Sequence, residues 1–217
     1  MKRFIAIDSK IFSEGFNTYC ISIYVTISMF KNAHGECFPS RKTIAKYGGF
    51  SVSTYNKYIK TIIANGYIKK QERWRENGSQ TSNLFTVSDI KVNTVFLNSD
   101  ITKKGLTANE LVVFVFLCSK KNSKNKCFIS QKDIAKACGM SVRTVSHIVN
   151  KLRQKKIIKT CTQCKSNNGN YILSYTICLC LEKSEEKYKV EKSIIENDFE
   201  CKDVRDNILC GIIKIIR

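Results

Sequence analysis

The sequence repeats itself with an offset of about 90 residues, and this internal repeat restricts the fold more than any other feature. Residues 4–87 align with residues 94–177 without a gap, with roughly 21 identities over about 84 positions. The most similar stretches are CFPSRKTIAKYGGFSVST and CFISQKDIAKACGMSVRT. We therefore predict two copies of one small domain, over residues 1–90 and 91–181, followed by an unrelated tail over residues 182–217.

Each copy contains three helix patterns. The first, over residues 18–30 and 108–119, has apolar residues at helical spacing and predicts a buried helix. The second covers residues 41–47 and 131–137, and glycine then provides a sharp turn before the third. Serines in the N-cap position precede the second and third patterns of both copies: Ser40, Ser51, Ser130 and Ser141.

The third helix pattern is amphipathic in both copies. In the first copy Tyr55, Ile59 and Ile62 fall on one face, and the aligned residues of the second copy are also apolar. The opposite face is polar and basic. It consists of Ser53, Asn56, Lys57 and Lys60 in the first copy, and of Arg143, Ser146, His147 and Asn150 in the second.

Two strand patterns close each copy, over residues 67–75 and 84–87 and over residues 157–165 and 171–181. They enclose polar tips rich in Asn and Gly, which favour hairpins. Trp74 lies in the first hairpin, and we expect it to pack across the hairpin rather than to stack on a nucleic acid. The sequence thus predicts a mainly α fold with small β-hairpins (α+β), built from two helix-turn-helix units that each carry a basic hairpin, or wing.

These residues resemble the winged helix-turn-helix proteins of bacteria, phages and plasmids. The stretches that carry the resemblance are CFPSRKTIAKYGGFSVSTYNKYIKTIIANGYI and CFISQKDIAKACGMSVRTVSHIVNKLRQKKII. The resemblance implies two tandem DNA-binding domains, as in plasmid replication initiators, whereas single domains of this type are common in transcription regulators. It also implies that the polar faces of both third helices enter the major groove of double-stranded DNA.

Further side chains are suitably placed for the DNA backbone, where contacts set the register without reading the sequence. On the second helices and near the third caps these are Arg41, Lys42, Lys46, Thr54, Lys132, Lys136 and Thr144. On the wings they are Arg73, Arg75, Lys159 and Lys165, for which entry into the minor groove is the alternative. The second copy has His147 where the first has Lys57, so we expect the domains to read different half-sites. If both lie on one face of the duplex, the expected spacing is about one helical turn.

The net charge supports an anionic partner. The formal charge is +19, divided into +7, +13 and −1 over residues 1–90, 91–181 and 182–217. Nucleic acid fits better than a membrane, because the longest apolar runs are too short to span a bilayer. The N-terminus lacks the pattern of a secretory signal, so we expect a cytoplasmic protein.

The eleven cysteines are expected to stay reduced in such a protein and to fill the core. Cys161, Cys164, Cys178 and Cys180 supply enough thiolates for zinc, but strand alternation directs the first two to opposite faces unless the hairpin bends. We predict no metal site and no cofactor. The sequence also lacks a phosphate-binding glycine loop and a catalytic pair, so we do not expect an enzyme.

The tail over residues 182–217 has mixed charges followed by an apolar stretch. Ser184 is suitable as a helix cap, so we predict a helical tail that serves as a partner or dimerisation surface, or packs on its own domains. A second hypothesis for the chain is a module that binds protein or structured RNA through the winged helices and this tail. A third, an enzyme that nicks or joins DNA, lacks a carboxylate and histidine cluster.

Overall fold

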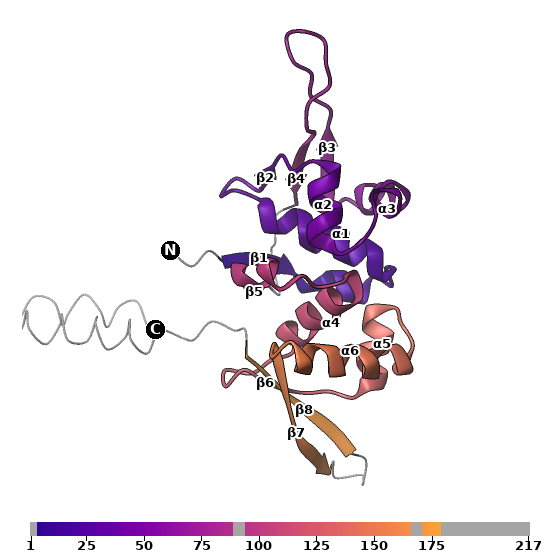
Figure 1. Cartoon of the computed structure of the whole chain (residues 1–217), viewed down its shortest axis with the longest axis vertical. Helices are drawn as coiled ribbons and strands as arrows, with labels where there is room; N and C mark the ends of the chain where they lie inside the picture. Colours follow the sequence, from indigo (N-terminus) through magenta and orange to yellow (C-terminus); the bar gives the residue numbers. More distant parts are fainter. Residues whose placement is uncertain (1–3, 89–93, 166–170, 179–217) are drawn as a thin grey trace, which may run out of the picture. The chain divides into compact units, whose positions relative to one another are not determined.

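The computed structural model describes residues 4–88, 94–165 and 171–178; the side chains of residues 161–165, 171 and 172 are not described (Figure 1). Residues 1–180 form one compact unit, which contains both repeats. The predicted helical tail over residues 182–217 and its proposed partner surface lie outside the described residues.

The first repeat has the element order of a winged helix with an extra strand and a short 3-10 helix in front. Its elements are β1 (Phe4–Asp8), η1 (Ser9–Ser13), α1 (Thr18–Phe30), β2 (Glu36–Cys37), α2 (Arg41–Gly48), α3 (Val52–Ala64), β3 (Ile68–Gln71) and β4 (Leu84–Val87). The second repeat has the same order. Its elements are β5 (Thr94–Asn98), η2 (Ser99–Lys104), α4 (Ala108–Ser119), β6 (Lys126–Phe128), α5 (Gln131–Cys138), α6 (Val142–Gln154), β7 (Ile158–Lys165) and β8 (Tyr171–Ile177).

All six α-helices predicted for the two repeats are present, and their ends follow from local chemistry. Each capping serine accepts the backbone N–H of the residue three positions later at 3.1 Å, as predicted for Ser40, Ser51, Ser130 and Ser141. Gly49 and Gly139 have φ values of 68° and 65°, so both turns use the left-handed region, where glycine has no steric penalty. The first helices, α1 and α4, are buried along nearly their whole length. Even these apolar helices are too short to cross a bilayer, and so is every other helix in the described ranges.

Each wing belongs to a three-stranded antiparallel sheet, in the order β2-β4-β3 or β6-β8-β7. The strands β2 and β6 were not predicted, because two or three residues are too few for a periodic pattern. The strand predicted over residues 67–75 is shorter than expected. Regular pairing ends where Gln71 pairs with Leu84, and the next bridge joins Trp74 to Gln80. The β4 side has one residue more than the β3 side between these two pairs, so the alternation of side chains is broken on the β4 side.

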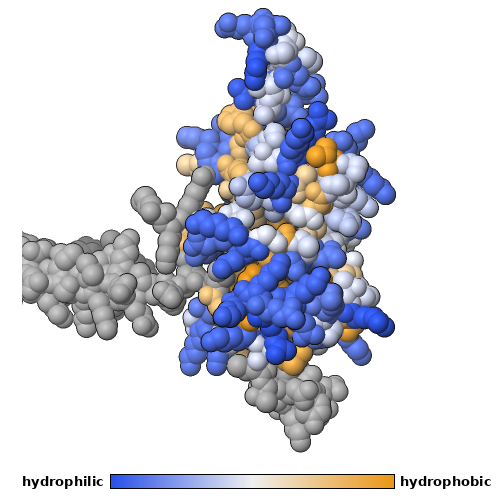
Figure 2. All heavy atoms as spheres, in the orientation of Figure 1, coloured by the Kyte–Doolittle hydropathy of each residue, from blue (hydrophilic) through white to orange (hydrophobic). Residues whose placement is uncertain are grey.

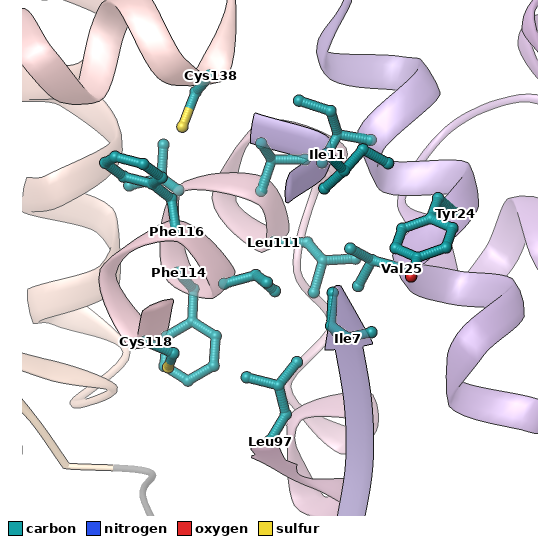
Figure 3. Packing of buried hydrophobic residues seen from close by; sticks show 14 of the residues in the cluster. Ile7, Ile11, Tyr24, Val25, Leu97, Leu111, Phe114, Phe116, Cys118 and Cys138 are labelled. Carbon is teal, nitrogen blue, oxygen red and sulfur yellow. The ribbon is translucent and has the colours of Figure 1, made fainter. Parts of the chain in front are cut away.

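The two repeats pack against each other through a continuous hydrophobic core. Strands β1 and β5 form a two-stranded antiparallel sheet that joins the repeats. The ring of Phe12 lies edge-on to that of Phe116 in α4, with 5.1 Å between centroids. Figure 3 shows the shared core: Ile7, Ile11, Tyr24 and Val25 of the first repeat, with Leu97, Leu111, Phe114, Phe116, Cys118 and Cys138 of the second. The positions of the helix-turn-helix units are thus fixed by a common core.

Candidate nucleic-acid interface

The helix α3 presents the polar face that its sequence predicts. Tyr55, Ile59 and Ile62 are buried on the inner side, where they hold the helix against the core. The predicted contact residues on the other side are all exposed: Ser53, Asn56, Lys57 and Lys60. Helix packing therefore leaves the amide and the two ammonium groups available to a ligand, whereas the hydroxyl of Ser53 shares a hydrogen bond of 2.7 Å with that of Ser51.

The helix α6 has the same arrangement with different side chains. Val145, Val149 and Leu152 are buried, as is Ile148, which the amphipathic pattern had not assigned to the core. Of the predicted contact residues, Arg143, His147 and Asn150 are exposed and Ser146 is half-buried. The amide oxygen of Asn150 accepts a long hydrogen bond from Arg153 at 3.4 Å. The face combines a guanidinium, an imidazole and an amide.

The predicted phosphate contacts Thr54 and Thr144 are less available than the residues around them. Both are half-buried, and their hydroxyls share hydrogen bonds of 2.9 and 2.8 Å with the hydroxyls of the capping serines Ser51 and Ser141. Thr54 thus supports the N-cap of α3, and Thr144 that of α6. A phosphate contact from either hydroxyl would have to share this bond.

A groove of about 750 Å³ lies between α2, α3 and the first wing. It brings together predicted residues from three separate segments: Arg41 of α2, Asn56 and Lys60 of α3, and Arg75 of the wing. It also contains Lys70, which was not predicted and which forms an ion pair with Glu72 at 3.1 Å. Two adjacent lysines, at positions 69 and 70 in β3, are the sequence feature that indicates a cation here. A cationic groove with an amide in its wall suits a polyanion that carries hydrogen-bonding edges.

The first wing is held to the body by a cation–π contact. The guanidinium of Arg73 lies 4.6 Å from the ring centroid of Phe38, in the loop before α2. Arg73 and Arg75 are both exposed. The expectation that Trp74 packs across the hairpin is wrong, because this residue is 62% exposed. Trp74 lies in the outer part of the wing, beyond the regular pairing that ends at Gln71 and Leu84, and Figure 2 shows a mostly hydrophilic wing at the top of the view.

The remaining basic candidates are exposed on both repeats. They are Arg41, Lys42 and Lys46 on α2, Lys132 and Lys136 on α5, and Lys159 on β7. Lys165 is the last residue of β7, and its side chain is not among those described. Every predicted contact residue whose side chain is described thus lies at least partly on the surface.

The buried cysteines behave as core residues. Cys20, Cys37, Cys118, Cys127 and Cys138 are buried and carry reduced thiols. Burial raises the pKa of Cys37 and of Cys138 to about 12, so both stay protonated near neutral pH.

The prediction of no zinc site at the four cysteines of the second wing falls mostly outside the described residues. The side chains of Cys161 and Cys164, and the whole of Cys180, lie outside the described part of the chain. Among the side chains that are described, no three His, Cys, Asp or Glu residues are grouped to hold a metal ion.

A model of the family described as "Helix-turn-helix domain" matches the chain twice, over residues 18–68 and 104–158. Each match covers the three helices of one repeat and reaches its first wing strand. No curated protein matches the chain. Because helix-turn-helix domains bind DNA through the second helix of the motif, the double match indicates DNA binding.

Proposed function

Because the chain carries two winged helix-turn-helix domains, we propose that it binds double-stranded DNA sequence-specifically, through α3 and α6 together, in replication initiation or transcriptional regulation. One observation carries the proposal: two capped amphipathic helices, each with its apolar side buried and its polar side exposed beside a wing. The proposal includes no catalytic step.

The side chains on the two helices suit different bases. The amide of Asn56 can pair with the N6 and N7 edge of adenine, whereas the guanidinium of Arg143 can pair with O6 and N7 of guanine. Both residues lie in the first half of their helices, the part that usually meets the base edges. Sequence discrimination is therefore assigned to these two residues, with Lys57, Lys60, His147 and Asn150 beside them.

The second helices and the wings supply backbone contacts. In the first repeat Arg41, Lys60 and Arg75 face one groove, so a phosphate strand in it would meet several cations at once. Lys42, Lys132 and Lys159 are exposed lysines suited to further phosphates. The net charge of +20 over residues 1–181 provides long-range attraction to DNA.

Duplex binding by the full chain, measured over a range of salt concentrations, tests the proposal. Neutralised phosphates release counterions, so the logarithm of the binding constant should fall linearly with the logarithm of the salt concentration, with a slope of about −0.9 per phosphate contact. A flat response to salt would contradict DNA binding. Structured RNA of the same length is the competitor. If it displaces the duplex at equal concentration, the alternative module that binds RNA is favoured instead.

Two sets of variants link the binding to the helices. The double variant K57A/K60A removes two cations of α3, and R143A removes the guanidinium on the predicted contact face of α6. Each should weaken duplex binding at least several-fold, and the slope should become less steep by about one per lost phosphate contact. The control is K103A in η2. This ammonium is paired with Asp100 at 2.9 Å outside the helix-turn-helix units, so its removal should leave affinity unchanged.

A further inference from the structure

We propose that the DNA site is an imperfect inverted repeat, because the chain is a covalent pseudo-dimer whose two recognition helices, α3 and α6, are related by an approximate two-fold axis. This inference rests on the proposed function and adds the symmetry of the substrate. A direct repeat, which a tandem chain also suggests, would require the two domains to be related by translation. Three sets of contacts between the repeats argue for rotation instead.

The first contact is the sheet formed by β1 and β5, which are equivalent strands of the two repeats. They pair in antiparallel orientation with the register Phe4↔Asn98, Ile5↔Leu97, Ala6↔Phe96, Ile7↔Val95 and Asp8↔Thr94. Ala6 aligns with Phe96, so the central pair joins equivalent residues, and the pairs on either side interchange under the alignment. Two equivalent strands can pair in this way only if one runs opposite to the other. The axis of rotation therefore passes through the middle of the sheet.

The second set of contacts joins the start of each first helix to the helix-turn-helix turn of the other repeat. The hydroxyl of Thr18 in α1 donates to the carbonyl of Cys138 at 2.7 Å, beside the α5–α6 turn. In the opposite direction, the N–H of Ala108 in α4 donates to the carbonyl of Gly49 at 3.3 Å, in the α2–α3 turn. Thr18 aligns with Ala108, and Cys138 lies next to Gly139, the residue that aligns with Gly49. The same surface is therefore used on both sides, as in an isologous dimer.

The two turn glycines give the third indication. A Cβ on Gly49 would lie 2.4 Å from the carbonyl oxygen of Leu106, and one on Gly139 would lie 3.2 Å from that of Phe16. Leu106 and Phe16 are aligned residues. Each recognition helix thus begins beside backbone of the other repeat, which fixes its direction relative to the axis.

This arrangement has a direct consequence for DNA. Two helices related by a two-fold axis that reach one duplex meet base edges along strands of opposite direction, which is why dimeric helix-turn-helix proteins bind palindromic sites. Here the helices differ: Asn56 and Lys57 in α3 align with Ser146 and His147 in α6. The two arms of the site should therefore be inverted in orientation but unlike in sequence, with adenine contacted by Asn56 in one arm and guanine by Arg143 in the other.

Site selection from random duplexes with the full chain, followed by rearrangement of the arms, tests the inference. Selection with N56A should lose one conserved position in one arm, and selection with R143A one position in the other arm; this assigns each arm to its helix. The selected duplex is then compared with a duplex in which one arm is reversed at constant spacing, and with duplexes that keep only one arm. All substituted residues are exposed, so folding is retained.

We expect the inverted duplex to bind at least about ten-fold more tightly than either single arm, since the second contact is intramolecular. Reversing one arm should return the affinity to that of a single arm. Tighter or equal binding of the reversed, direct arrangement would overturn the inference, and so would a selected site with one arm only. In both cases specific duplex binding itself would survive. If no duplex binds with salt dependence, the proposed function fails, and the inference fails with it.

Discussion

Lys156 ends α6 in a conformation that suits glycine. Its φ is 56°, and its N–H donates to the carbonyl of Arg153, while the N–H of Ile157 donates to Leu152. The aligned residue of the first repeat is Gly66, with φ of 75° and the same pair of bonds. This helix termination requires the left-handed region, where a Cβ costs free energy. The second repeat therefore carries strain that the first avoids.

Lys156→Gly should raise the free energy of unfolding by about 1 kcal/mol, because the cap geometry is kept and the strain is removed. Urea unfolding measures this change. Lys151→Gly, in the last turns of the same helix, is the matched control and should lower stability by about 0.5–1 kcal/mol, because glycine is unfavourable in a helix. Equal effects of the two substitutions would mean that the backbone angle at Lys156 carries no strain.

Glu110 is a buried carboxylate at the start of α4. It is 2% exposed, accepts from the N–H of Thr107 at 2.8 Å, and pairs with Lys155 at 2.8 Å. Burial alone would raise its pKa, but the hydrogen bonds from Lys155 and Thr107 outweigh burial, and the pKa lies below the usual value. The pair ties the start of α4 to the end of α6. The first repeat has Cys20 and Asn65 at these positions.

Lys155→Met should destabilise the chain by about 1–3 kcal/mol at neutral pH, because it leaves a buried carboxylate with fewer partners. A folded-state pKa below the unfolded value stabilises the protein above the unfolded pKa, and this contribution disappears as the pH falls through the folded pKa. The difference between wild type and variant should therefore shrink as the pH falls below about 4, where the carboxyl group becomes protonated.

Denaturant unfolding between pH 3 and pH 7 measures the effect. Lys103→Met breaks the exposed pair with Asp100 and should change stability little at any pH. A difference for Lys155→Met that stays constant with pH would show that lost packing, not the carboxylate, is responsible.

At the scale of elements, the two wings are attached differently. Arg73 stacks on Phe38 in the first repeat, whereas the second repeat has Gln163 at the position of Arg73 and Phe128 at that of Phe38. Phe128 is 54% exposed. The orientation of the first wing therefore depends on an aromatic residue outside the wing.

Phe38→Ala should release Arg73 and weaken duplex binding about two- to five-fold without changing the preferred sequence, since an exposed cation–π contact contributes about 0.5–1 kcal/mol. Hydrogen exchange at the N–H of Thr81, which donates to the carbonyl of Arg73, should become faster in the same variant. Phe128→Ala is the control and should have neither effect. An altered base preference in Phe38→Ala would mean that this residue acts on α3 and not on the wing.

The sequence was sufficient for elements defined by local signals. Serine caps, glycine turns and apolar spacing predicted all six α-helices, and the exposed residues of α3 follow directly from its buried ones. Local sequence signals did not predict features that depend on strand pairing or tertiary packing. Trp74 is exposed in the outer part of the wing, beyond the regular pairing of β3 with β4, and β2 is too short for a pattern. The groove joins Arg41, Lys60 and Arg75, whose proximity depends on tertiary packing and not on spacing in the sequence.

The strands β1 and β5 and their pairing were outside the reach of local reasoning, because neither Phe4–Asp8 nor Thr94–Asn98 alternates apolar and polar residues. Ile5 and Ile7 are buried, with Phe4 exposed beside them, and Val95 and Leu97 alternate in the same way. Burial alternates only in the folded chain, and each strand's partner lies in the other repeat. Only the tertiary structure identifies this partner, and with it the two-fold relation.

For the molecule as a whole, the shared core implies that the repeats unfold together. Gly49→Ala tests this coupling, because the added Cβ would lie 2.4 Å from the oxygen of Leu106 and 2.6 Å from the Cα of Thr107, both in the other repeat. The φ of 68° adds about 1 kcal/mol of strain, and the clash with backbone adds about 1–3 kcal/mol more. Gly139→Ala has nearly the same φ but a nearest contact of 3.2 Å, so it should carry mainly the first cost.

The two variants separate coupled repeats from independent ones by where the damage appears. Because β1, β5, α1 and α4 contribute to one core, Gly49→Ala should lower the protection of slowly exchanging amides in α4 and α6 as much as in α1 and α3, within a single unfolding transition. Independent repeats would give two transitions, with only the first repeat destabilised. In that case the interface would be too weak to fix the two recognition helices, and their orientation on DNA would be set by the DNA itself.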